Sequence, residues 1–124
     1  MINMQQRFGK QSETLAVKHL KKNGFKILEK NYRTKLGEID IIARDKDTIV
    51  FVEVKSRKSD RYGTPKHAIT RSKKRKISMV ALYYLKTLDE KNTRARFDVV
   101  AIHSGEDRSP KIEMIKNAFE LAYG

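Results

Sequence analysis

The sequence predicts one α/β domain in which helices cover a central mixed sheet. Helical and strand periodicities alternate along the 124 residues, in the order helix, three strands, helix, strand, strand. The first three strands follow one another as adjacent hairpins, which favours a mixed sheet over a purely parallel one. No linker, repeat or low-complexity segment divides the chain, so we expect residues 1–124 to form a single domain around one core.

The first half of the chain predicts a helix and three strands. Apolar residues recur at helical spacing through Gln6–Asn23, and an Asn-Gly pair is a typical helix end. A short strand is expected at Phe25–Asn31. The two best strands are Glu38–Arg44 and Thr48–Lys55, because both are rich in Ile, Val and Phe and a three-residue hairpin loop separates them.

The second half predicts a helix, two strands and a short terminal helix. Thr70–Lys86 carries an apolar stripe at helical spacing, although its first turns are almost entirely basic. Arg96–His103 has the composition of a strand, and Lys111–Ile115 is a weaker strand. We expect a short helix at Asn117–Ala122.

The charge of the chain predicts a polyanionic partner. The 28 Lys and Arg residues exceed the 15 Asp and Glu residues, which gives a net charge of +13. Ten of the basic residues and a single acid lie between Lys55 and Lys76. Neutralising phosphates with such a patch releases counterions, so we expect nucleic acid as the partner. A solvated helix face or loop is the structural alternative for this run.

Other features of the composition exclude several classes of protein. The chain has no cysteine, which excludes disulfide scaffolds, thiol catalysis and thiolate metal sites. No apolar run approaches the ~20 residues of a membrane span, and the polar N-terminus does not resemble a signal peptide. We therefore expect a cytoplasmic protein that makes no membrane contact.

Charged residues stand in the middle of the two most apolar strands. Asp40 lies in the first of them, and Glu53 and Lys55 lie two residues apart in the second. If the residue numbers of a hairpin pair sum to 93, Asp40 opposes Glu53 and their Cβ atoms are about 5 Å apart. A register sum of 92 would instead oppose Asp40 to Val52, and hydrophobicity does not decide between the two registers.

Such a cluster suits phosphoryl chemistry. Two carboxylates can hold Mg²⁺, which prefers oxygen ligands, and a lysine beside them can bind a phosphate or stabilise charge in the transition state. The alternative is an ion pair on a half-exposed sheet face. Glu38 is expected to point away from Asp40 as a surface charge. Asp98, a charge within another apolar strand, could support Lys73 or Arg96, or form a simple ion pair.

The same strands resemble a known family. The segments GEID at 37–40 and FVEVKSR at 51–57 are similar to the signature of the YraN-like uncharacterised bacterial protein family. The resemblance covers nearly the whole chain. It also includes Gly9, Glu13 and Ala16, Asn31–Arg33, Gly63, Pro65 and Lys73, Arg96–Val99 and Asn117–Phe119.

That resemblance implies a place in the PD-(D/E)XK nuclease superfamily, beside restriction endonucleases and Holliday-junction resolvases. It implies a restriction-endonuclease-like αβββαβ core, with Asp40 and Glu53 as metal ligands and Lys55 as the catalytic lysine. Glu13 would match the first-helix acid of resolvase-like members, and the carbonyl of Val54 would complete a site for Mg²⁺ or Mn²⁺. Ile39 stands where the superfamily motif ideally has proline. Resolvase-like relatives act as dimers, which leaves a homodimer open.

These observations predict a metal-dependent endonuclease that hydrolyses DNA phosphodiesters, on branched or damaged DNA. Phosphate contacts carry no base sequence, so we expect a preference for DNA structure rather than sequence. The alternatives are a nucleic-acid-binding module on a nuclease fold and an adaptor for an acidic protein. The residues expected to hold the DNA backbone are Arg57, Lys58, Lys73, Lys74 and Lys76.

Overall fold

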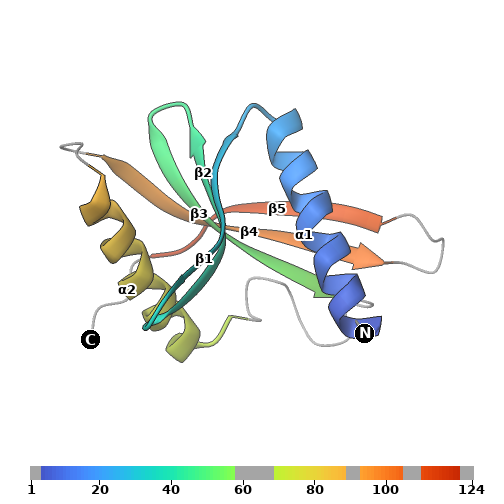
Figure 1. The fold of residues 1–124 in the computed structure, drawn as a ribbon. Helices are drawn as coiled ribbons and strands as arrows, with labels where there is room; N and C mark the ends of the chain where they lie inside the picture. The colour runs from blue at the N-terminus through green and yellow to red at the C-terminus, as the bar shows by residue number, and fades with distance from the viewer. Residues whose placement is uncertain (1–3, 58–68, 89–92, 105–109, 121–124) are drawn as a thin grey trace.

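The computed structural model describes residues 4–57, 69–88, 93–104 and 110–120 (Figure 1). Its elements follow the predicted order of helix, three strands, helix and two strands, and the α/β class is confirmed. Neither helix in these ranges is long and apolar enough to cross a membrane. The elements are α1 (Met4–Lys22), β1 (Lys26–Thr34), β2 (Gly37–Asp45), β3 (Thr48–Arg57), α2 (Arg71–Thr87), β4 (Arg94–Ser104) and β5 (Pro110–Phe119).

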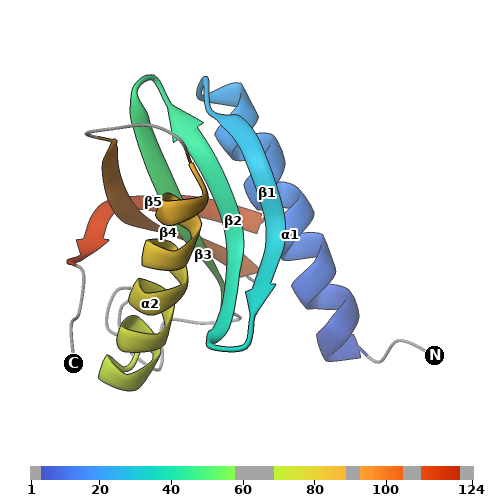
Figure 2. The ribbon, with the colours of Figure 1, turned by 60° about the vertical axis from the view of Figure 1, so that its left-hand side comes forward.

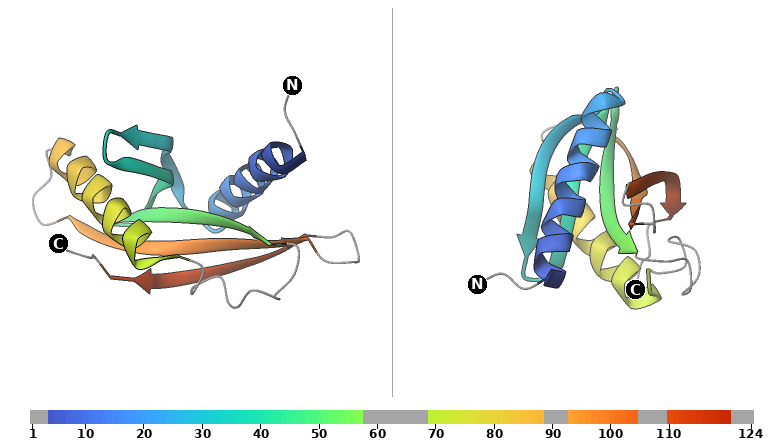
Figure 3. Two further views of the ribbon diagram at one scale, coloured as in Figure 1. Left: turned by 90° about the horizontal axis from the view of Figure 1, so that it is seen from below. Right: turned by 90° about the vertical axis from the view of Figure 1, so that its right-hand side faces the viewer.

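The five strands form one mixed sheet in the order β1-β2-β3-β4-β5. The central pair β3–β4 is parallel and the other neighbours are antiparallel. A parallel pair needs a crossover, and α2 lies in the connection between β3 and β4. The two helices stand well apart beside the β1–β2 hairpin (Figures 2 and 3).

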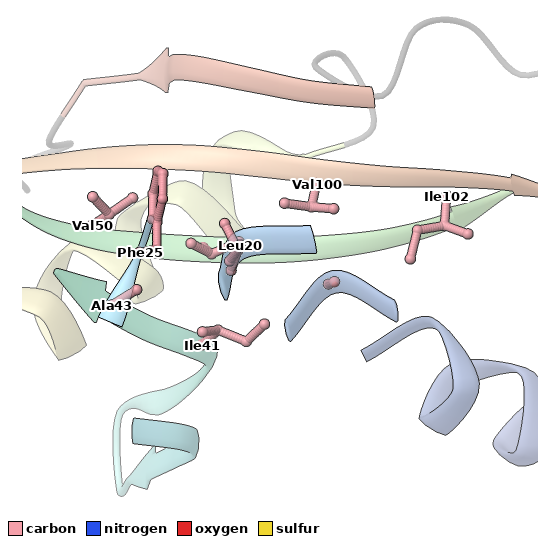
Figure 4. Packing of buried hydrophobic residues seen from close by; sticks show 9 residues of the cluster. Leu20, Phe25, Ile41, Ala43, Val50, Val100 and Ile102 are labelled. Carbon is pink, nitrogen blue, oxygen red and sulfur yellow. The ribbon is translucent and has the colours of Figure 1, made fainter. Parts of the chain in front are cut away.

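Strand β3 is buried on both faces, which explains its continuous apolar sequence. Val50 and Val52 face α1 and pack in a cluster with Leu20 and Phe25 (Figure 4). The alternate side chains of β3, among them Phe51, pack with α2. Because side chains alternate across a strand, Glu53 belongs to the α2 face.

The predicted terminal helix at Asn117–Ala122 is wrong as far as Phe119, because β5 runs through to that residue. Ala118 is buried against Val99, and the Phe119 ring stacks on Phe97 with centroids 4.6 Å apart. These contacts with β4 outweigh the local preference of the segment. Residues 121–124 lie outside the described ranges.

Candidate active site

The candidate site lies where β2 separates from β3. Of the two registers left open by the sequence, the structure has the one in which the residue numbers of each pair sum to 93, because Ile42 pairs with Phe51. Backbone pairing ends at Ile41 and Val52, however, so Asp40 and Glu53 are not a ladder pair. The Asp40 carboxylate instead accepts a hydrogen bond of 2.9 Å from the backbone N–H of Val54. One carboxylate therefore replaces the backbone partner that β2 no longer offers.

A bend of the β1–β2 hairpin causes this separation. Asn31 lies opposite Asp40, between the pairs Lys30–Ile41 and Tyr32–Ile39, and its φ of 52° is in the left-handed region that asparagine tolerates. The normal alternation of side chains fails at this level, since Ile41 packs in the α1 cluster and Ile39 in the α2 cluster. The outer part of the hairpin rises from the plane of β3–β5 (Figure 3, left).

Two lysines surround the carboxylate of Glu53. Only 5% of the surface of Glu53 is exposed. The Nζ of Lys73 lies 2.5 Å from its Oε1, and the Nζ of Lys55 lies 4.0 Å from the same oxygen. Lys55 comes from the same strand face as Glu53, whereas Lys73 comes from α2. The buried carboxylate is thus neutralised by the protein itself, as a buried charge must be.

The first turn of α2 positions Lys73. Thr70 caps this helix, and its hydroxyl oxygen accepts a 3.1 Å hydrogen bond from the backbone N–H of Lys73. The turn contains no acidic residue, although the positive end of the helix dipole favours acids and disfavours lysine. The sequence thus contradicts helix preference at this point, which is typical of functional positions. The ion pair with Glu53 compensates for it.

The electrostatics of the cluster follow from its burial. Burial raises the pKa of Asp40, although the hydrogen bond from Val54 and the nearby lysines act against it. Burial also raises the pKa of Glu53, and repulsion by Asp40 adds to this effect. Burial and repulsion by Lys73 lower the pKa of Lys55. Burial would lower the pKa of Lys73 too, but its hydrogen bond to Glu53 leaves that pKa raised.

Asp40 and Glu53 line one cavity of about 380 Å³ at the N-terminus of α2. Lys73 and Lys76 line the same cavity, which places both lysines within reach of a ligand there. Glu38 also lines this cavity, and its Oε2 lies 3.3 Å from the Nε of Arg33. The expectation that Glu38 points away from Asp40 is therefore wrong. Even in a regular strand, residues two apart return to the same face, so their spacing gave no reason to expect Glu38 and Asp40 on opposite faces.

Glu13 lies on the other side of Asp40. It lines a second cavity, of about 470 Å³, together with Asn31 and Asp40. Burial and the charge of Asp40 raise its pKa, while a hydrogen bond from Asn31 lowers it. Glu13 and Glu53 thus line different cavities that share Asp40.

The structure places the side chains of three of the five predicted DNA-backbone residues, and these three have different surroundings. Lys73 belongs to the carboxylate cluster and Lys76 to its cavity, whereas the Nζ of Lys74 lies 5.7 Å from the ring centroid of Phe119. Lys58 and the side chain of Arg57 lie outside the described part of the chain. The contact of Lys73 with Glu53 joins residues twenty apart, so strand parity could not reveal it. The sequence did offer one indication that Lys73 is a functional residue. Lys73 lies in the first turn of a helix that Thr70 caps, and that turn contains no acidic residue.

Asp40 and Glu53 have the donor chemistry that Mg²⁺ or Mn²⁺ requires. Mg²⁺ is typically held by one or two carboxylates together with waters and substrate phosphates. A carboxylate pair that lines an open cavity, with Glu53 buried and Asp40 half-buried, fits this pattern. Among the described residues, no group of three His, Cys, Asp or Glu side chains is arranged to hold a metal ion. The third ligand predicted at Glu13 thus stays a prediction.

Asp98 forms a structural ion pair with Arg96. It is fully buried, and the Nε of Arg96 donates to both of its carboxylate oxygens at 3.0 and 3.1 Å. Arg96 also donates to Asp45, at 2.9 Å. Asp98 accepts a further 3.1 Å hydrogen bond from the backbone N–H of Asn117. These contacts support Arg96, rather than Lys73, as its partner.

The sequence of the chain is similar to those of known proteins, and the matching region contains the residues of the candidate site. The family model described as "Uncharacterised protein family UPF0102" matches residues 12–102, a range that contains Glu13, Asp40, Glu53 and Lys73. A UPF0102 protein of Syntrophus aciditrophicus is 55% identical over 118 residues, which cover 95% of this chain and 92% of that protein. The corresponding protein of Desulfosudis oleivorans is 51% identical over 120 residues, with 97% and 95% covered. That of Geobacter metallireducens is 53% identical over 116 residues, with 93% of each chain covered.

Proposed function

The chain belongs to the UPF0102 family, and from this premise we propose that it is a metal-dependent nuclease of the PD-(D/E)XK type. It would hydrolyse phosphodiester bonds of DNA, with Mg²⁺ or Mn²⁺ as the cofactor. The observation that carries the proposal is a pair of carboxylates, those of buried Glu53 and half-buried Asp40, in one cavity that Lys73 and Lys76 also line. A fold gains no stability from two repelling acids, so a ligand function explains them better than packing does.

The roles of the side chains follow from their positions. Asp40 and Glu53 would hold the metal ion, which when bound supplies a Lewis acid for the phosphoryl oxygen and for water. In hydrolysis the oxygen of water bonds to phosphorus while one bridging phosphorus–oxygen bond breaks. Lys55, half-buried beside Glu53, would stabilise the negative charge that develops on the phosphoryl oxygens. Lys76, at the cavity wall, would hold the neighbouring phosphate.

One observation favours a second candidate, a nucleic-acid-binding module without cleavage. Lys73 already neutralises Glu53, so the cluster is electrically satisfied without a metal ion. The basic residues around it would then bind phosphates, and the acids would only position Lys73. Both candidates bind DNA, and only the nuclease depends on a divalent metal ion.

A cleavage assay separates the two candidates. Linear, flapped and four-way-junction DNA are incubated with the protein and Mg²⁺ or Mn²⁺, and with EDTA as the metal-free control. The nuclease is expected to cut at least one form only when metal is present, and Glu53→Gln should abolish this cutting. Binding without cleavage of any form would favour the binding module. Two lysine variants control for the loss of one positive charge. Lys76→Gln removes a lysine that lines the cavity, and Lys86→Gln removes an exposed lysine that lines neither cavity.

A further inference from the structure

The second cavity is a groove between α1 and the β1–β2 hairpin. Its volume of about 470 Å³ falls in the range of ligand sites, about 300–1,000 Å³. Its lining includes Glu13 and Asp40. Four exposed lysines also line it: Lys10, Lys18, Lys21 and Lys30.

The groove leads to the carboxylates of the candidate active site. Asp40 lines both cavities, so the groove and the cavity of Glu53 adjoin at this residue. Lysines therefore lie on both sides of the carboxylates, along α1 and β1 on one side and at the start of α2 on the other. A polyanion that crosses Asp40 would contact basic side chains before and after it.

The residues that line the groove are suited to binding the sugar–phosphate backbone of a nucleic acid rather than its bases. The described residues around the groove include no aromatic side chain on which a base could stack, and the lysines are suited to phosphates. A positively charged groove can track the sugar–phosphate backbone of a single strand, and contacts with phosphates carry no base sequence. A duplex presents two strands around a wide cylinder, whereas α1 and the hairpin enclose a space of ligand size.

We propose that this groove binds a single-stranded segment of nucleic acid and directs it to Asp40. The inference rests on the proposed function and names its substrate class, which is DNA with a single-stranded branch beside a duplex. The strand lies along α1 and β1, and its sugar–phosphate backbone reaches the carboxylates at the bend of the hairpin. The duplex portion remains on the side of α2.

Binding without divalent metal tests this inference. The groove variant replaces Lys18, Lys21 and Lys30 by Gln. The control variant replaces Lys22, Lys46 and Lys86 by Gln, which removes the same charge at exposed positions that line neither cavity. The probes are a fluorescent oligothymidylate, a blunt duplex and the same duplex with a single-stranded flap, each titrated with salt in EDTA. Circular dichroism and melting temperatures establish that both variants fold.

The groove variant is expected to bind the oligothymidylate and the flapped duplex about tenfold more weakly or worse. The slope of log K against log salt for the single strand should fall by about 0.7 for each phosphate that the variant no longer neutralises. The blunt duplex should respond equally to both variants. Equal reductions of flap binding in both variants, or a reduction confined to the blunt duplex, would overturn the inference.

The binding experiment can refute the groove proposal independently of whether the protein is a nuclease. Binding is measured without metal, so cleavage plays no part in it. A wild type that cuts no DNA, with a selective reduction of flap binding in the groove variant, would refute the nuclease and retain the groove. A wild type that cuts DNA, with equal reductions in the two variants, would retain the nuclease and refute the groove.

Discussion

Replacing Lys73 by methionine tests whether this lysine neutralises the buried carboxylate of Glu53. The change removes the ammonium group beside Glu53 and keeps an unbranched side chain that helices tolerate. Glu53, only 5% exposed, would then lie beside Asp40 with Lys55 at 4.0 Å as its remaining described cationic contact. We expect the variant to fold but to be less stable when metal is absent.

The size of the effect follows from burial. Breaking a fully buried ion pair by removing one partner costs about 3–5 kcal/mol, and a hydrogen bond to a charged group contributes about 1.5–3 kcal/mol. The side chain of Lys73 is 42% exposed, so water screens part of the interaction. We therefore expect the free energy of unfolding at neutral pH to fall by about 2 kcal/mol. For a domain of this size, that lowers the melting temperature by roughly 6–10 °C.

The destabilisation should depend on pH with a defined sign. The pKa values of Asp40 and Glu53 are raised above their usual 3.8 and 4.5, so the folded protein binds more protons than the unfolded chain just above those values. Stability contributed by these groups therefore falls as the pH rises from about 4 through the raised pKa values. Without Lys73 the pKa of Glu53 rises further. The difference between variant and wild type should be small near pH 4 and largest at neutral pH.

The assay is thermal unfolding in EDTA between about pH 4 and pH 8, a range that begins near the ordinary pKa values of carboxyl groups and extends well above them. Lys76→Met is the matched control, because Lys76 is an exposed lysine of the same helix and cavity. Equal melting temperatures of the two variants across this range would refute the neutralising role of Lys73. Calorimetry adds an independent measurement. If Mn²⁺ competes with the ammonium group, Lys73→Met should bind Mn²⁺ at least about tenfold more tightly, the equivalent of one charged hydrogen bond.

Three further predictions concern catalysis, metal binding and stability. Glu53→Gln and Lys55→Ala should each reduce cleavage by about two orders of magnitude or more in a gel assay, while DNA binding in EDTA persists. Mg²⁺ should raise the melting temperature of the wild type by mass action, and Glu53→Gln should lack this response in the same melting experiment. Arg96→Gln should lower the free energy of unfolding by about 3 kcal/mol in urea denaturation, because it strands the fully buried Asp98.

Much of the fold could be predicted from the sequence because its signals are local. Periodic apolar residues and an Asn-Gly stop defined α1, and the apolar runs of β2 and β3 marked a hairpin. The end of β5 could not be found in this way, because Phe119 is held by a stack on Phe97, a partner far away in sequence. Tertiary contacts of this kind override a short segment's own preference.

The candidate site was predictable to the extent that strand parity applies. Parity placed Glu53 and Lys55 on one face, and a register sum of 93 brought Asp40 to the same level. Parity assumes a straight strand, whereas β2 bends beside the left-handed Asn31. The salt bridge from Lys73 depends on how α2 crosses the sheet, which no spacing within the helix encodes.

Asp40 and Asp98 look alike in the sequence, and the structure shows what distinguishes them. Each is an acid within an apolar strand, and each accepts a backbone N–H at an interruption of pairing with the next strand, close to an asparagine of positive φ. Asp98 has a guanidinium bound to both oxygens and no exposed surface, and the hydrogen bond that it accepts from Asn117 joins β4 to β5. Asp40 uses one oxygen for Val54 and lines two cavities, beside a second acid of raised pKa. In both places a carboxylate accepts a hydrogen bond from the backbone N–H of a neighbouring strand. At Asp98 the interaction is purely structural, whereas at Asp40 it leaves one carboxylate oxygen available to a ligand.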